Sequence, residues 1–128
     1  MAKSKLTKTK EISEETKRKV LERQRGKSLS GVALTPYNTE FHHVIFRSGS
    51  GVGYEWNIVA ITSEEHRLYH DHQNIKVYGR ERFTWDEFDT IMKNHLKYEY
   101  PNWTEKLCKY HIYWEEKDYG ITYRREQN

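Results

Sequence analysis

The sequence has little of several residue types, and each shortage excludes a class of protein. It contains one cysteine, Cys108, among 128 residues. This excludes a disulfide framework within one chain and any zinc site built from several thiolates. No apolar run approaches the roughly 18 residues that a membrane span requires, and the basic start is not followed by the apolar core of a signal peptide. We therefore expect a single cytoplasmic domain that has no membrane partner.

Positive charge is concentrated at the N-terminus. Residues 1–27 contain ten Lys or Arg and four Glu, a net charge of 10 − 4 = +6, whereas the whole chain has a net charge of +3. A basic segment attracts phosphates without regard to base sequence, so this distribution favours a nucleic acid partner. A solvated basic tail explains it equally well. Residues 1–11 are polar and rich in Lys, and we expect them to form a disordered arm.

Capping residues and the spacing of apolar residues predict an α+β fold. Ser13 begins one predicted helix, which Gly26 ends, and Thr84 with Glu87 forms the capping box of another. Between these helices, two strands rich in β-branched and aromatic residues flank a glycine-rich turn at 49–53 and predict a hairpin. We expect helices at 13–25, from 63 onwards and at 84–100, strands within 41–48 and 55–62, and a weak strand or a loop around Gly79.

Four of the seven histidines have a spacing that suits a metal site. His42 and His43 are adjacent on the first strand, where neighbouring side chains point to opposite faces. His66 and His70 follow Ser63, which can cap a helix, and their i, i+4 spacing places them on one helical face. Such a pair alone is more often a surface pair. Together with one strand histidine, however, it makes three imidazole ligands and leaves positions open for water or phosphate. The other strand histidine, with an ordinary pKa of about 6.5, is then available as a general base.

The order of these residues resembles the signature of the HNH endonucleases, whose fold is the ββα-metal core. The similarity rests on "HH", on Asn57 in "WNIV" and on "EEHRLYH", and the ligand arrangement is most similar to that of the colicin-type nuclease domains. The stretch "EFHHVIFRSGSGVGYEWNIVAITSEEH" also resembles small phage-encoded HNH proteins. Many of those relatives carry two Cys-x-x-Cys pairs that bind a structural zinc. The corresponding regions here read "SLSG" (28–31) and "TSEE" (62–65), so we expect that zinc to be absent.

The resemblance implies a fold and a role for each residue of the motif. The motif core would span 40–72 within a single nuclease domain at 12–128. The core would be a β-hairpin and a helix, with further helices on its N- and C-terminal sides. His43 would be the general base, and Asn57 would support catalysis by holding the loop and helping to orient His43. A backbone carbonyl could equally be the group that orients His43. The ligands of one divalent ion would be His42, His66 and His70.

The activity implied by the resemblance is metal-dependent hydrolysis of DNA phosphodiester bonds, leaving 5′-phosphate and 3′-hydroxyl ends. One site per chain implies a nick, and we expect a monomer or a weak dimer. Imidazole sites bind Zn²⁺ or Ni²⁺ tightly, yet Mg²⁺ or Mn²⁺ can be the working ion, so all four stay candidates. If the chain is phage-encoded, it would act in the host cytoplasm. The main alternative is a DNA-binding module whose metal site is structural and non-catalytic. A second alternative is a metal-binding or pH-sensing protein unrelated to DNA.

Basic side chains beside the motif and on the first predicted helix are candidate contacts to DNA phosphates. A surface salt bridge accounts for Arg47 about as well as a phosphate contact does. The candidates are Arg47, Lys17, Arg18, Arg23 and Arg25.

Overall fold

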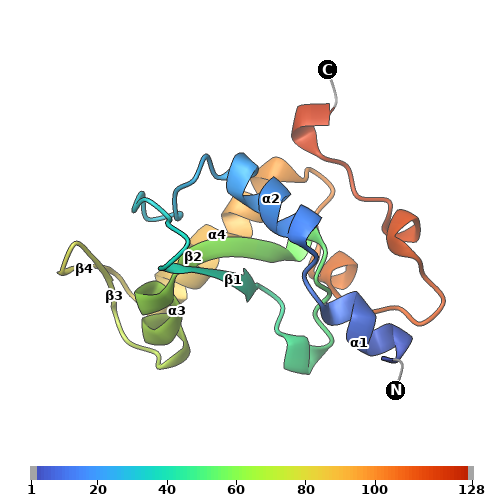
Figure 1. The fold of residues 1–128 in the computed structure, drawn as a ribbon, viewed down its shortest axis with the longest axis horizontal. Helices are drawn as coiled ribbons and strands as arrows, with labels where there is room; N and C mark the ends of the chain where they lie inside the picture. Colours follow the sequence, from blue (N-terminus) through green and yellow to red (C-terminus); the bar gives the residue numbers. More distant parts are fainter. Residues whose placement is uncertain (1–2, 127–128) are drawn as a thin grey trace.

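The computed structural model describes residues 3–126 and has a mixed α+β architecture, which confirms the predicted fold class (Figure 1). Two small antiparallel hairpins, β1–β2 and β3–β4, are combined with α-helices and short 3₁₀ turns. No helix within residues 3–126 is both long and apolar enough to cross a membrane. The elements are α1 (Lys5–Lys10), α2 (Glu14–Arg23), β1 (Thr39–His43), β2 (Ile58–Thr62), α3 (Ser63–His70), β3 (Ile75–Val77), β4 (Arg80–Phe83) and α4 (Trp85–Glu99).

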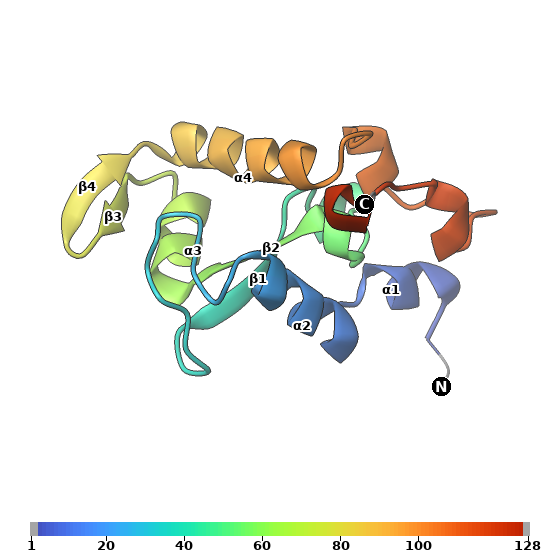
Figure 2. The same cartoon turned by 90° about the horizontal axis from the view of Figure 1, so that it is seen from above.

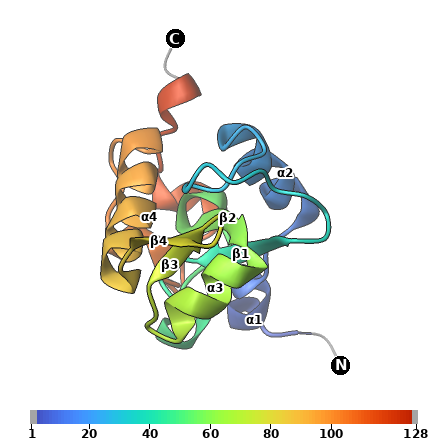
Figure 3. The ribbon, with the colours of Figure 1, turned by 90° about the vertical axis from the view of Figure 1, so that its left-hand side faces the viewer.

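The β1–β2 hairpin is covered on both faces, with α2 on one side and α4 on the other (Figure 3). Successive residues of β2 point to opposite faces. Ile58 and Ala60 pack against Val20 of α2, whereas Val59 and Ile61 belong to the larger core cluster. That cluster also holds the buried stripe of α4, which consists of Phe88, Met92 and Leu96. The five residues of β2 are therefore all buried.

Local capping signals place the longer helices close to their predicted bounds. The Ser13 hydroxyl accepts a hydrogen bond from Thr16 N at 3.1 Å and begins α2. Thr84 and Glu87 form the predicted capping box of α4. The cap of α3 lies one residue earlier than Ser63, because Thr62 and Glu65 form the capping box there.

Glu65 also connects residues 28–30 to the start of α3. Its carboxylate is 1% exposed. It accepts hydrogen bonds from the Ser28 hydroxyl at 2.7 Å, from the Ser30 hydroxyl and from the backbone N–H of Thr62. A buried, fully hydrogen-bonded carboxylate thus links residues 28–30 to the start of α3.

The N-terminal arm differs from its prediction. Instead of being disordered throughout, the arm forms α1, which Ser4 caps, and the residues after this helix lie against the core. The backbone N–H of Gly53 donates to the Thr9 carbonyl at 2.8 Å, and a Cβ on Gly53 would lie 2.1 Å from the Glu11 carbonyl oxygen. Backbone packing on a glycine orders this segment despite its polar composition. The ends of the predicted arm and domain, residues 1–2 and 127–128, lie outside the described residues.

Two further elements differ from the prediction. The first strand ends at His43 rather than at residue 48, because a loop with a 3₁₀ turn at Arg47–Gly49 follows it. The segment around Gly79 forms a complete hairpin, β3–β4, which projects from one end of the molecule (Figure 2). Tyr78 and Gly79 make its turn with φ angles of 52° and 77°. This is the left-handed backbone that two-residue hairpin turns require.

Candidate metal centre

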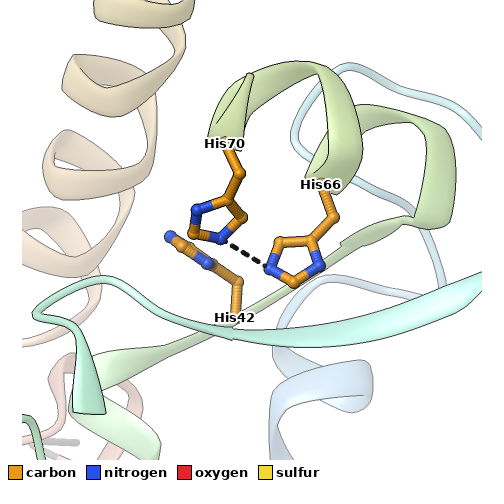
Figure 4. A group of neighbouring side chains, drawn as sticks. All are labelled: His42, His66 and His70. Atoms are coloured by element: carbon orange, nitrogen blue, oxygen red, sulfur yellow. Dashed lines mark hydrogen bonds between the residues drawn. The ribbon is translucent and has the colours of Figure 1, made fainter. Parts of the chain in front are cut away.

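Three imidazoles from two elements converge beside the β1–β2 hairpin (Figure 4). His42 projects from β1, and His66 and His70 project from the facing side of α3. One ring nitrogen of each lies within 4.8 Å of the others. The i, i+4 spacing puts the helical pair side by side, and the packing of α3 against β1 brings this pair to the strand. The structure thus gathers the three predicted ligands into a group that could hold a metal ion.

His42 differs from the other two histidines in being buried with an unpartnered ring nitrogen. Its side chain is 2% exposed, yet its Nε2 atom has no hydrogen-bond partner among the described residues. Burial, reinforced by the neighbouring imidazoles of His66 and His70, lowers the pKa of His42 to about 3. The ring is therefore neutral at physiological pH. A buried polar atom without a partner is costly, and a neutral imidazole nitrogen with a free lone pair is the form that binds a metal.

Glu40 orients the His66 ring, a contact that the sequence analysis did not assign. Glu40 lies two residues before His42 on β1, so both side chains point to the same face. The Glu40 Oε2 and His66 Nδ1 atoms are 3.1 Å apart. With the proton on Nδ1, His66 presents the lone pair of Nε2 to the cluster, where His70 Nε2 lies 3.0 Å away. Carboxylates that hold metal-binding histidines in this way are common around protein metal sites.

His43 faces the opposite side of β1 and has a different environment. Its Nε2 lies 2.8 Å from the carbonyl oxygen of Lys10, the last residue of α1. A carbonyl only accepts, so Nε2 carries the proton and Nδ1 keeps its lone pair. Burial lowers the pKa of His43, and the hydrogen bond to Lys10 opposes this effect without cancelling it. His43 is thus a neutral base with one free nitrogen.

A groove runs past both kinds of histidine. It consists of two adjoining clefts of about 400 and 480 Å³. The first cleft contains the three clustered imidazoles and the second reaches Lys17 and Glu11. The residues that line both clefts are Phe41, His43, Arg47 and His66. A phosphate bound in this groove would lie between the imidazole cluster and His43.

Asn57 holds the loop that follows β1. The side chain is fully buried, and its Oδ1 accepts a hydrogen bond from Ile45 N at 2.8 Å. Its Nδ2 donates to the carbonyls of Ile45 at 3.0 Å and Val52 at 2.8 Å. The amide therefore holds the loop, while the hydrogen bond that orients His43 comes from the Lys10 carbonyl.

The predicted phosphate contacts differ in how accessible they are. Arg47 is exposed at the groove, and Lys17 lines it while pairing with Glu14 at 3.1 Å. Arg18 and Arg25 are exposed on or just beyond α2, where Arg18 pairs with Glu22.

The prediction for Arg23 is wrong. Its side chain is 3% exposed and points into the protein. The guanidinium donates to buried backbone and side-chain acceptors, among them the Ile58 carbonyl at 2.6 Å and the Tyr100 hydroxyl at 3.1 Å. A buried guanidinium whose N–H groups already donate to internal acceptors is not available to contact a phosphate.

Sequence reasoning missed the roles of Glu40 and Lys10 for different reasons. The alternation of β1 places Glu40 on the face of His42, and this signal was readable in advance. Lys10 acts through its backbone carbonyl, which leaves no trace in residue type. His72, the other histidine near the motif, stacks on Trp85 with ring centroids 4.2 Å apart and lies outside the cluster.

A scan against models of protein families, a search of curated proteins and a search of solved structures each found no match. The interpretation of this site therefore depends on its own geometry and chemistry.

Proposed function

We propose that this chain is an HNH-type endonuclease with a ββα-metal core, formed by β1, β2 and α3, and that it nicks DNA with the help of one divalent ion. The observation that carries the proposal is the unpartnered Nε2 of His42, which faces the imidazoles of His66 and His70. Beside it, His43 lines the same groove with a free Nδ1. A ligand set and a separate neutral base at one groove are the parts that hydrolysis of a phosphodiester requires.

The donor set fits a divalent cation. His42, His66 and His70 would hold it, and the Glu40 carboxylate supports the ring of His66. Three neutral imidazoles suit Zn²⁺ or Ni²⁺, and Mg²⁺ or Mn²⁺ stay candidates for the working ion. When bound, the ion supplies positive charge that stabilises the negative charge developing on the phosphate and on the leaving oxygen.

The side chains of the protein supply the general base and the contacts to the substrate phosphates. His43 Nδ1 takes a proton from a water molecule, and the Lys10 carbonyl stabilises the ring in the required tautomer. The water oxygen then bonds to phosphorus while the bond to the 3′ oxygen breaks, and the leaving oxygen takes a proton from solvent. The products are a 5′-phosphate and a 3′-hydroxyl. Arg47 and Lys17 would contact phosphates along the groove, with Arg18 and Arg25 further out on the same duplex.

A supercoiled-plasmid assay tests this proposal. Wild-type protein is incubated with Mg²⁺, Mn²⁺, Zn²⁺ or Ni²⁺, with a chelator control, and metal binding is measured separately by calorimetry. We expect His42→Ala to lose both metal binding and nicking. We expect His43→Ala to keep the metal and to nick roughly 10²–10⁴-fold more slowly, which is the usual contribution of a general base. His72→Ala is the matched control, since His72 lies outside the cluster, and it should behave as the wild type.

Each other outcome excludes a specific part of the proposal. Nicking by His43→Ala at the wild-type rate would remove the base role of His43. Loss of the metal in His43→Ala but not in His42→Ala would mean that the two roles are reversed. A wild-type protein that binds both metal and DNA but never nicks would support the alternative, a DNA-binding module with a structural metal site.

A further inference from the structure

The β3–β4 hairpin ends in a side chain that the fold does not use. The hairpin projects from one end of the molecule, beyond α3 and the start of α4 (Figure 2). Tyr78 at its turn is 81% exposed and, within residues 3–126, makes no hydrogen bond through its side chain. A large aromatic ring held in water at the tip of a rigid turn is the kind of side chain that contacts a partner.

Unpaired positive charge surrounds this ring. Lys76 precedes the turn and Arg80 and Arg82 follow it, and all three side chains are exposed. Within the described part of the chain, none of the three forms an ion pair. The hairpin has one acidic residue, Glu81, which accepts a hydrogen bond from Asn74 Nδ2 at 3.1 Å. The outer part of the hairpin therefore presents a net positive charge that the protein does not neutralise.

The hairpin is attached to the core only at its base. Ile75 is fully buried, and the ring of Phe83 lies 6.3 Å from that of Phe88 in α4, centroid to centroid. These contacts hold the start of β3 and the end of β4. The side chains of Tyr78, Arg80 and Arg82 are exposed and add nothing to this packing. The exposed ring and charges of these residues are therefore accessible to a partner.

We propose that the β3–β4 hairpin is a second DNA-contacting element, whose tip enters the major groove of the duplex bound at the histidine groove. This inference takes DNA as the partner from the proposed function and assigns it a surface that the nuclease motif does not include. A two-stranded β-ribbon fits the roughly 12 Å width of the major groove. Arg80 and Arg82 contact the phosphates that border the groove, and Tyr78 contacts the base edges within it.

The chain connectivity favours DNA over an acidic protein as the partner. The hairpin begins five residues after His70, so it is joined to the ligand-bearing helix by a short loop. At about 3.3 Å per residue along a strand, the hairpin reaches roughly 10 Å past its buried base. A duplex bound at the histidine groove is long enough to pass the hairpin as well, whereas an acidic protein would have to be a separate partner.

The test is a salt titration of binding to a fluorescent 30-base-pair duplex, measured by anisotropy in a chelator so that no cleavage occurs. The variant Arg80→Gln/Arg82→Gln should reduce the slope of log K against log salt by about 1.8, since each lost phosphate contact removes about 0.9. Lys106→Gln/Lys117→Gln is the matched control. Both lysines are exposed, and neither makes an ion pair within residues 3–126. We expect this control to keep the wild-type slope.

Tyr78→Asn separates the aromatic contact from the fold of the turn. Asn followed by Gly79 is the preferred pair for a two-residue turn with positive φ angles, so this change preserves the hairpin. We expect roughly tenfold weaker duplex binding with an unchanged salt slope, because an uncharged contact is lost. Wild-type affinity in this variant together with a wild-type slope in Arg80→Gln/Arg82→Gln would overturn the proposal, as would a wild-type protein that does not bind the duplex. Binding without nicking in the presence of metal would overturn only the proposed catalytic function.

Discussion

At the scale of single residues, two adjacent histidines on β1 point to opposite faces of the strand and have different environments. His42 faces α3, where burial and other imidazoles lower its pKa to about 3 and leave Nε2 without a partner. His43 faces the C-terminal end of α1, where the Lys10 carbonyl fixes its tautomer. The alternation of β1 therefore places the candidate metal ligand and the candidate base, which are adjacent in the sequence, on opposite faces of the strand. The neighbours of each ring, rather than the residue type, decide what it can do.

The contact between Glu40 and His66 leads to a prediction about metal affinity. Glu40→Gln removes the negative charge that holds the His66 Nδ1 proton and makes Nε2 a better donor to a metal. We expect the affinity for Zn²⁺ or Ni²⁺, measured by calorimetry, to fall about 10–100-fold, the usual effect of changing such a supporting residue. Glu64→Gln is the control, because Glu64 is exposed on the first turn of α3. Equal affinities in the two variants would show that Glu40 does not support the metal site.

At the scale of the element, the quality of the sequence prediction follows from where each signal lies. The helices α2 and α4 carry their caps in their own sequence, and their predicted bounds agree with the structure to within two residues. In contrast, α1 and β3–β4 are short and depend on contacts with distant residues. The backbone at Lys10 and Glu11 packs against Gly53, and the ring of Phe83 at the end of β4 packs near that of Phe88. Such contacts are not encoded locally, so the sequence indicated a disordered arm and a weak strand.

The same distinction applies to the site. The order of His42, His66 and His70 along a strand and a helix was enough to predict their convergence, because the spacing within each element is fixed. The partner of His43 is a backbone carbonyl in a segment 33 residues earlier in the chain. Nothing in the residue types of that segment indicates this contact, so only the structure could show it.

The docking of the N-terminal segment on Gly53 yields a prediction about catalysis. In Gly53→Ala, the added Cβ would lie 2.1 Å from the Glu11 carbonyl oxygen and 2.8 Å from that of Lys10, so the segment that holds the partner of His43 must shift. We expect nicking to slow by roughly 100-fold, a usual cost of a small displacement of a catalytic group. Metal affinity should stay unchanged, because the clustered imidazoles are on the other face of β1.

Gly49→Ala is the matched control for this change, since an added Cβ at Gly49 would meet no atom within 4 Å. It lies in the same loop and should nick at the wild-type rate. If both glycine variants nick equally fast, the Lys10 carbonyl is not needed to orient His43. If Gly53→Ala loses metal as well as activity, the damage extends to the whole site.

At the scale of the whole molecule, one buried guanidinium joins layers that lie on opposite sides of the β1–β2 hairpin. Arg23 comes from α2 (Figure 3), and its Nε donates to His95 of α4 at 2.9 Å. The Nη1 atom of the same group donates to the Glu55 carbonyl at 2.9 Å and to the Tyr100 hydroxyl at 3.1 Å. Burial, followed by the charges of Arg23 and Arg125, lowers the pKa of His95 to about 3, so its ring is a neutral acceptor.

This arrangement predicts that Arg23 and Arg18, neighbours on α2 that look alike in the sequence, have different functions. Arg23→Ala leaves several buried acceptors without a donor, each at a cost of about 1–3 kcal/mol. We expect the free energy of unfolding in urea to fall by about 3 kcal/mol or more. Arg18 is exposed and forms only an i, i+4 pair with Glu22, so Arg18→Ala should change that free energy by less than about 0.5 kcal/mol. A loss of stability of similar size in both variants, or in neither, would mean that α2 is held to the core by its apolar contacts alone.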